Sequence, residues 1–308
     1  MKSLIDLYKE HSGKTSDKWS SYLGVYDETF RSYRDKPVRL VEVGVQNGGS
    51  LEIWAKYFTN AVSITGVDIN PKCAELTFVD PRIRVLVGDV NHPEVKDRLC
   101  ASGEIDIFID DGSHTSPDIV KTFLNYFPVV KHNGVFLAED LHCSYWKKFD
   151  GGLFYPFSSM TFFKLLADVI NLEHWGVAFS ANDILAGFCE KYKTGMDERF
   201  YKTIHSVTFL NSVCVVTRNN QNGNQLGDRI FVGYEALIPC RGEMLAPDEV
   251  KNPWSAERVP PDQQIIFLKA KIERQQMRIR EIESSRSWRM TRPFRVLMNR
   301  LVSSGKSR

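Results

Sequence analysis

Five short apolar segments constrain the fold of this chain more than any other feature of its sequence. Each is about as long as one strand, and they are residues 38–45, 63–69, 83–90, 105–111 and 134–141. Helical stretches separate them, for example residues 50–58 and 117–130. Apolar strands that alternate with helices are typical of a parallel sheet with helices on both faces. The sequence therefore predicts an α/β protein built on an open, mostly parallel sheet.

The regions on either side of this alternation extend the prediction. Residues 20–33 are predicted to form a helix before the first strand, and residues 158–174 a helix after the fifth. Residues 205–211 and 212–219 predict a C-terminal antiparallel pair in the sheet. We expect an N-terminal helical cap, a sheet domain, a proline-containing linker, and a helical extension with a basic tail, at residues 1–37, 38–219, 220–261 and 262–308.

Acidic residues close all five apolar segments. They are Glu42, Asp68, Asp89, the pair Asp110 and Asp111, and the pair Glu139 and Asp140. Ligands of open parallel sheets bind outside the carboxyl ends of the strands, so these acids are expected to face one cleft. The sequence thus predicts an acidic binding site at this edge of the sheet.

The turn after the first strand, EVGVQNGG, indicates the kind of ligand. Gly44 and Gly48 allow the backbone to approach a ligand closely in front of a helix. The dinucleotide fingerprint would need a glycine at position 46, which is Gln46 here. The spacing E-x-G-x-x-x-G instead suits S-adenosylmethionine, with Asp68 accepting hydrogen bonds from the ribose hydroxyls and Asp89 meeting the adenine amino group. A different nucleotide-binding α/β fold is the alternative.

Several motifs together resemble one enzyme family. They are SDKW with YLGVYD (16–27), LVEVGVQNGGSLEIWAKYF (40–58), GVDINP (66–71), IDDGSHT (109–115), GVFLAEDLHCSYW (134–146) and IHSVTFLNSVCVV (204–216). They are similar to segments of the metal-dependent class I O-methyltransferases that act on deoxysugars of macrolide antibiotics, the macrocin and mycinamicin type, and of cephalosporin hydroxylase-like proteins. The resemblance covers residues 15–217. It implies a Rossmann-like class I methyltransferase fold and methylation of a sugar hydroxyl.

The resemblance also implies roles for individual residues. Position by position, it assigns a magnesium or manganese ion to Asp111, Glu139 and Asp140, and assigns catalysis to His114, as the base, together with Asp111. The glycine turn and the strand ends, in turn, give the residues expected to bind S-adenosylmethionine: Glu42, Gly44, Asn47, Gly48, Asp68, Asp89 and Asp110. Elementary electrostatics agrees, because three carboxylates at the ends of neighbouring strands would repel one another unless a hard cation lay among them. A cation that orients the hydroxyl and an imidazole that accepts its proton would serve the transfer.

Structural interpretations of the same residues stay open. Four have an alternative as a helix N-terminus, a strand end or a packing position: Asp111, His114, Glu139 and Asp140. Asp110 either faces the cofactor or caps the next helix. Others either contact a ligand or pack in the protein: Lys18, Tyr22, Tyr26, His142 and Tyr145.

Charge is distributed unevenly along the chain. Residues 265–308 hold twelve lysines and arginines against three acids, a net charge of +9, which leaves −7 on residues 1–264 of a total of +2. The segment RSWRMTRPFRVL (286–297) resembles tails that follow short coiled coils in bacterial surface-glycan enzymes. A basic and aromatic segment can lie on an anionic membrane. We therefore predict O-antigen or capsule polysaccharide assembly, with peripheral contact of residues 286–308 at the inner membrane; a solubilising tail is the alternative.

Apolar a and d positions between Ile265 and Ile282 predict a short coiled coil that joins copies of the chain or docks a partner. A helix packed on its own domain is equally consistent with them. Six scattered cysteines without a CxxC pair, and no apolar run long enough for a signal peptide or a membrane span, favour a cytoplasmic location. The expected partner is a glycan or sugar-bearing small molecule, and no motif indicates nucleic acid. Competing functions are a nucleotide-sugar glycosyltransferase, with IDIFIDD as its metal motif, and a non-catalytic scaffold.

Overall fold

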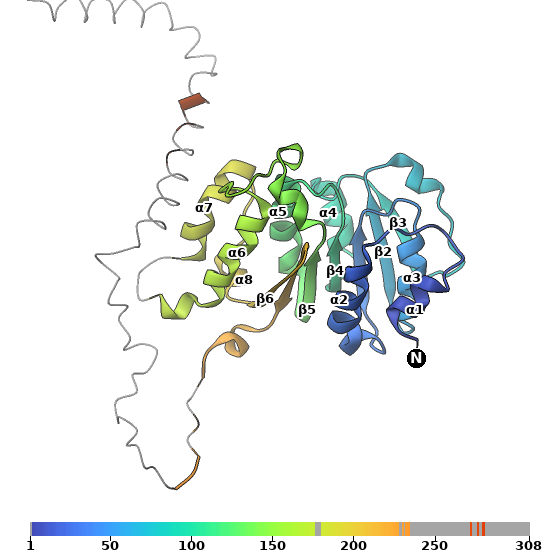
Figure 1. Ribbon diagram of the computed structural model, residues 1–308, viewed down its shortest axis with the longest axis horizontal. Helices are drawn as coiled ribbons and strands as arrows, with labels where there is room; N and C mark the ends of the chain where they lie inside the picture. The colour runs from blue at the N-terminus through green and yellow to red at the C-terminus, as the bar shows by residue number, and fades with distance from the viewer. Residues whose placement is uncertain are drawn as a thin grey trace, which may run out of the picture. The chain divides into compact units, whose positions relative to one another are not determined.

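Seven strands form one sheet in the order β3-β2-β1-β4-β5-β7-β6. Their bounds are β1 Arg39–Val43, β2 Ser63–Asp68, β3 Ile83–Val87, β4 Ile105–Asp110, β5 Val130–Ala138, β6 Ile204–Leu210 and β7 Val213–Arg218. The first five strands are parallel, and β7 runs antiparallel to both β5 and β6. This Rossmann-like sheet, drawn in Figure 1, confirms the predicted fold class. Each of the five predicted apolar segments overlaps one of the parallel strands β1 to β5.

Eight α-helices accompany the sheet in the part of the chain that the structure describes. They are α1 Leu4–Lys9, α2 Ser20–Phe30, α3 Gly49–Tyr57, α4 Pro93–Cys100, α5 Ser116–Tyr126, α6 Ser159–Ile170, α7 Ala181–Tyr192 and α8 Glu198–Tyr201. The helices expected at 20–33, 50–58, 117–130 and 158–174 correspond to α2, α3, α5 and α6. The sequence did not predict α1, α7 or α8. These three are short or follow no clear apolar alternation.

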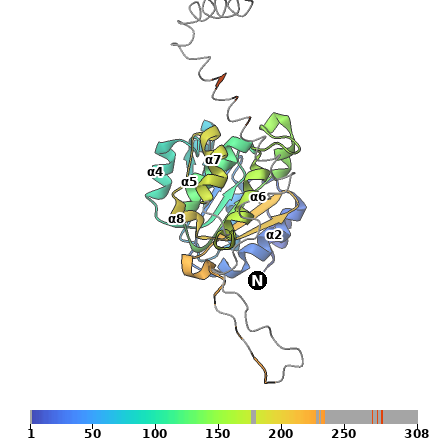
Figure 2. The ribbon, with the colours of Figure 1, turned by 90° about the vertical axis from the view of Figure 1, so that its left-hand side faces the viewer.

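Helices cover both faces of the sheet, as a doubly wound fold requires. On one face, Leu40 and Ile109 share a buried core with residues of α1, α2 and α3. Trp54 lies at the centre of this core, and its ring meets that of Tyr26 at 5.3 Å between centroids. On the other face, Phe136 packs against Phe123 of α5, 5.1 Å away. Figure 2 shows α4 and α5 on one side of the sheet and α2 on the other.

One glycine lets the turn after β1 lie directly against the end of β4. Gly44 has φ +91, and a Cβ added there would lie 2.1 Å from the carbonyl oxygen of Asp111. Any larger residue would push these strand ends apart, besides straining the left-handed backbone. The sequence expected Gly44 to make room for a ligand, and the structure adds that it makes room for the neighbouring strand.

The structure describes residues 2–175, 180–227, 230, 232–234, 272, 276 and 279–280. The chain divides into two units, Met1–Ala256 and Glu257–Arg308. The helix predicted from residue 262 lies outside the described residues except at 272, 276, 279 and 280, which are helical, and so does the basic tail. None of the described helices combines the length and the apolar character needed to cross a bilayer. The five described cysteines are free thiols.

Candidate active site

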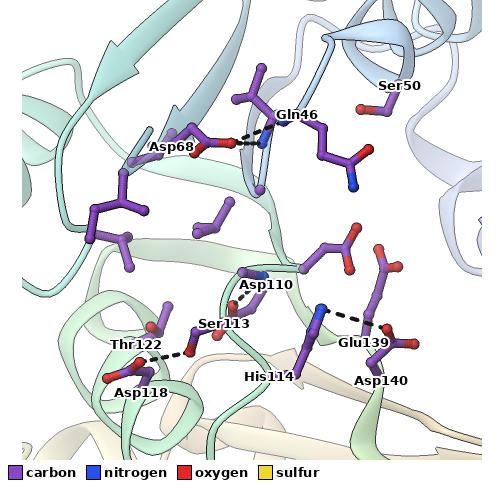
Figure 3. Close-up of a pocket in the computed structure, with 18 of the residues that line it drawn as sticks. Gln46, Ser50, Asp68, Asp110, Ser113, His114, Asp118, Thr122, Glu139 and Asp140 are labelled. Carbon is purple, nitrogen blue, oxygen red and sulfur yellow. Dashed lines mark hydrogen bonds and ion pairs between the residues drawn. The ribbon is translucent and has the colours of Figure 1, made fainter. Parts of the chain in front are cut away.

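A cavity of about 600 Å³ opens at the carboxyl ends of the parallel strands, within the usual size range of small-molecule sites. Its walls come from the ends of β1 to β5 and from the N-terminal segment Thr15–Trp19. Figure 3 shows Asp68, Asp110, His114, Glu139 and Asp140 around it. Eight of the predicted site residues line it: Gly44, Asp68, Asp89, Asp110, Asp111, His114, Glu139 and Asp140. Three others, Glu42, Asn47 and Gly48, do not line the cavity. The structure therefore gathers most of the predicted site in one place.

The half of the cavity near β1 and β2 is built around Asp68. One oxygen of its carboxylate accepts hydrogen bonds from the backbone N–H groups of Val45 and Gln46, at 2.8 and 2.9 Å. The other accepts the N–H of Asn70 at 2.8 Å. Asp68 thus holds the glycine turn in place, and it also lines the cavity, where a hydroxyl group of a ligand could donate to its carboxylate. Asp89 lies exposed on the next strand end.

Glu42 lies beneath the cavity instead of in its wall. Its side chain is fully buried, and one carboxylate oxygen accepts hydrogen bonds from Ser50 at 2.6 Å and from the Trp54 indole at 3.2 Å. Its other oxygen lies 3.3 Å from the ammonium of Lys18. Glu42 therefore supports the site from below, and it does not reach a ligand in the cavity.

Lys18 is the central charge of the buried part of the site. Its ammonium lies 2.5 Å from Asp111 Oδ2 and 2.8 and 2.9 Å from the two oxygens of Glu139, besides the contact with Glu42. Burial by itself would lower the pKa of Lys18, but the carboxylates, Glu139 foremost, raise it well above its usual value. Burial raises the pKa of Glu139, and the ammonium opposes that rise. Lys18 is therefore a permanent cation that compensates buried carboxylates.

A second group of polar side chains lies next to this cluster and lines the cavity. Asp111, His114 and Asp140 offer ligand atoms that all lie within 4.8 Å of one another. Nε2 of His114 is 3.6 Å from Oδ2 of Asp140 (Figure 3), and Tyr22 donates a 2.6 Å hydrogen bond to Oδ1 of Asp140. The indole of Trp19 donates to the same oxygen at 3.2 Å. The N-terminal helical cap is thus fastened to Asp140.

This donor set fits a hard divalent cation. Carboxylate oxygens are the ligands that Mg²⁺ and Mn²⁺ prefer, and an imidazole is compatible with Mn²⁺. The group is half-buried and borders the cavity, so water or a hydroxyl could complete the coordination. Nδ1 of His114 is also buried without a hydrogen-bond partner among the described residues.

Of the residues whose role the sequence left open, several are now placed. Tyr26 packs in the core, whereas Tyr22 reaches Asp140 with its hydroxyl. Asp110 is buried, its Oδ1 accepts the N–H of Gly112 at 3.3 Å, and its Oδ2 has no hydrogen-bond partner among the described residues. Asp110 therefore borders the cavity as a buried acid and does not cap α5.

Sequence reasoning missed Ser212, which lies in the turn between β6 and β7. Its hydroxyl oxygen lies 2.8 Å from the hydroxyl oxygen of Tyr22 and 2.5 Å from Nδ1 of His142. Ser212 has φ +69, so its backbone is held in the left-handed region that this tight turn requires. No signal in the sequence links a hairpin serine to residues 70 and 190 positions away.

A row of ring contacts joins two residues that line the cavity, Trp19 and His114, and we call it the aromatic rim. It passes from Trp19 through His142, Trp146 and Phe149 to His114, with centroid separations of 6.1, 5.0, 6.1 and 6.4 Å. Trp19 and Trp146 are 60% and 52% exposed. Large exposed rings beside a polar site are suited to stacking on a ligand.

Comparison with known proteins agrees with this geometry. Residues 41–141 match the family model of a methyltransferase domain. The 8-demethyl-8-alpha-L-rhamnosyl tetracenomycin-C 2'-O-methyltransferase of Streptomyces olivaceus is 39% identical over 146 residues, which are 44% of this chain and 38% of that protein. Demethylmacrocin O-methyltransferase of Streptomyces fradiae is 35% identical over 182 residues, 55% of this chain and 45% of that protein. The chain thus spans less than half the length of these relatives.

A solved structure is similar as well. It is the MycE methyltransferase from the mycinamycin biosynthetic pathway in complex with Mg, SAH and mycinamycin VI. It shares 26% identity with this chain at a TM-score of 0.58, over 74% of this chain and 57% of that one. These findings confirm the resemblance to class I sugar O-methyltransferases of the macrocin and mycinamicin type that the sequence motifs indicated.

The buried carboxyl of Asp110 leads to a prediction about stability. Burial raises its pKa from the usual 3.8 to about 7, so the native protein binds this proton more tightly than the unfolded chain does. The resulting stabilisation is present below pH 3.8 and is lost as the pH rises through about 7. Asp110→Asn keeps a neutral group of the same shape. We expect the metal-free variant to match the wild type near pH 4 and to exceed its unfolding free energy by about 2–4 kcal/mol at pH 8.

Urea unfolding with a chelator present, at both pH values, measures this difference. The exposed acid Asp97 supplies the control, because Asp97→Asn should change stability equally little at pH 4 and pH 8. An Asp110→Asn variant whose stability relative to the wild type does not depend on pH would contradict the prediction.

Proposed function

We propose that this protein is a metal-dependent O-methyltransferase that moves a methyl group from S-adenosylmethionine to a sugar hydroxyl. The observation that carries the proposal is the division of one cavity into two halves. The half around Asp68 and Asp89 offers backbone and carboxylate groups to a nucleoside, and the half around Asp111, His114 and Asp140 offers a cation site and a base. The similarity to sugar O-methyltransferases supports the same conclusion.

In the proposed reaction the hydroxyl oxygen of the acceptor forms a bond to the methyl carbon as the bond from that carbon to the sulfonium sulfur breaks. The products are a methyl ether, S-adenosylhomocysteine and a proton. A divalent cation, when bound, would polarise the hydroxyl and stabilise negative charge on its oxygen. Asp111 and Asp140 would hold that cation. Glu139, also expected as a ligand, directs both of its oxygens to Lys18.

His114 is the proposed acceptor of the proton. It lies in the turn between β4 and α5, and its backbone has φ +57. Its ring lies beside Asp140. The imidazolium that forms would be stabilised by the Asp140 carboxylate, 3.6 Å from Nε2. The floor beneath the site is buried, since Glu42 and Glu139 are at most 1% exposed.

The aromatic rim is the proposed binding surface for the acceptor sugar. It starts at Trp19, which lines the cavity, and ends at His114, so a ring stacked on it would present a hydroxyl to the base. The apolar face of a sugar ring stacks readily on exposed indole rings.

We also propose that residues 286–308 hold the enzyme at the cytoplasmic side of the inner membrane, where lipid-linked or nucleotide-linked sugars of a surface polysaccharide are available. The net charge of +9 over residues 265–308 and the resemblance of this tail to those of surface-glycan enzymes support the proposal. Pairing of the heptad helix between copies is part of it. Ile272 and Ile279, both at a positions, are 51% and 54% exposed, as expected before pairing.

Calorimetry provides the first test of the site. We expect S-adenosylmethionine to bind the wild-type protein at micromolar concentration, and Mg²⁺ then to give a separate signal. Asp111→Ala should abolish the metal signal and leave cofactor binding intact, because Asp111 belongs to the cation group. Failure of the wild type to bind S-adenosylmethionine would refute the proposed function.

His114→Gln tests the base. Loss of general-base catalysis should lower kcat by about 10²–10⁴-fold, while the affinity for S-adenosylmethionine stays within about threefold. The measurement is methyl transfer to a panel of glycosides and sugar nucleotides. A variant with wild-type kcat would assign the proton to another group.

Trp146→Ala tests the aromatic rim. Loss of one stacking ring, worth about 0.5–1.5 kcal/mol, should raise KM for the acceptor by about 2–12-fold. Tyr234→Ala removes a fully exposed ring that is not part of the rim and is the matched control. Equal KM values for the two variants would remove the rim from the acceptor site.

Deletion of residues 286–308 tests the membrane contact. The full chain should sediment with vesicles that contain anionic lipid and not with neutral vesicles, because attraction of the basic tail is electrostatic. The shortened chain should stay in solution with both, at unchanged affinity for S-adenosylmethionine. Full-length protein that anionic vesicles do not retain would exclude this role for the tail.

A further inference from the structure

Two groups of metal-ligating side chains share Asp111. The outer group, Asp111 with His114 and Asp140, borders the cavity; its two carboxylates are the proposed cation ligands, and His114 is the proposed base. The inner group is Asp111 with Glu42 and Glu139, and its ligand atoms also lie within 4.8 Å of one another. By donor type alone, the inner group is the better site for a hard cation, since it consists of three carboxylates.

The inner group already contains a cation that belongs to the chain. The Lys18 ammonium contacts all three carboxylates, at 2.5 Å from Asp111, 2.8 Å from Glu139 and 3.3 Å from Glu42. The three N–H donors of the ammonium reach Asp111 and both oxygens of Glu139, and Glu42 joins the group through an ion pair. Its side chain is only 3% exposed. We propose that Lys18 takes the place of a metal ion in the inner group, so that the protein binds a single divalent cation, at the outer group.

The surroundings of the inner group favour an ammonium over a hydrated metal. Mg²⁺ binds proteins while keeping several of its water ligands, which need space and access to solvent. Glu42 and Glu139 are 0% and 1% exposed, so the inner group offers little of either, although Lys18 and Glu139 border the cavity. The outer group faces a cavity in which water or a substrate hydroxyl can complete the coordination sphere.

The segment that carries Lys18 is fixed at several points. The carbonyl of Thr15 accepts the N–H of Gly49 at 3.2 Å, and the N–H of Lys14 donates to Glu52 at 3.0 Å. The indole N–H of Trp19, the residue after Lys18, donates a hydrogen bond to Asp140. The backbone that carries Lys18 is therefore fixed on both sides, so the fold places the lysine beside the carboxylates.

Counting bound Mn²⁺ tests this inference, with equilibrium dialysis and the electron paramagnetic resonance signal of free Mn²⁺ as readouts. Wild-type protein should bind one Mn²⁺ per chain and Asp140→Asn none. Lys18→Ala, which vacates the inner group, should bind two. The double variant Lys18→Ala with Glu42→Gln should return to one, because the inner group then lacks a carboxylate. A Lys18→Ala variant that still binds one Mn²⁺ would overturn the inference.

Glu42→Gln in the otherwise wild-type chain gives a second test that does not require Lys18→Ala to fold. Glu42 faces the ammonium, so the variant should still bind one Mn²⁺, with a Kd within about threefold of the wild type. Loss of the bound Mn²⁺ would mean that the metal displaces Lys18 and enters the inner group, and would overturn the inference.

The inference depends on the proposed function only in assuming a cation at the outer group. The role of Lys18 and the metal-dependent function can therefore be refuted separately. Wild-type protein that binds no Mn²⁺, with Lys18→Ala binding one, would refute the metal-dependent function and support the role of Lys18. One Mn²⁺ in both proteins, lost with Asp140→Asn, would support the metal site and refute the role of Lys18.

Discussion

The ion cluster of Lys18 with Glu42, Asp111 and Glu139 is the interaction on which the rest of the site depends. It joins the N-terminal segment to the ends of β1, β4 and β5 in one contact. Such a cluster is tolerated only while each member has a partner, and removing one partner of a buried pair typically costs about 3–5 kcal/mol. The site and the cap of the fold are therefore stabilised by the same lysine.

The order of the strands explains why the carboxylates meet. β1 lies between β2 and β4, and β5 follows β4, so the ends of β1, β4 and β5 are neighbours although their sequences are far apart. Gly44 brings the turn after β1 against the Asp111 carbonyl, which narrows the gap further. Crowding of acids at this edge is a consequence of topology, and the ammonium and the proposed cation divide the resulting charge between them.

Much of this could be predicted from the sequence, because local pattern and topology determine it. Apolar runs set the strands, and the acid at each strand end had to reach the same edge of a parallel sheet. Lys18 and Ser212 could not be placed, since their partners lie 24 to 190 residues away and a lone lysine or serine carries no pattern. Glu42 was placed in the cofactor site for its position, but the side chain points to the covered face of β1, where Ser50 and Trp54 bind it.

The inner and outer groups differ in their access to solvent, and this difference fits the proposed chemistry. A group that binds an acceptor hydroxyl and releases a product on every cycle must lie open to the cavity, as Asp111 and Asp140 do. A group that only balances charge is better closed, because a fixed ammonium needs no reorganisation during the reaction. Asp111 belongs to both, with Oδ2 bound to Lys18. Lys18 therefore orients the Asp111 carboxylate for the cation. A substitution of Lys18 would alter the position of the Asp111 oxygen that is proposed to bind the cation.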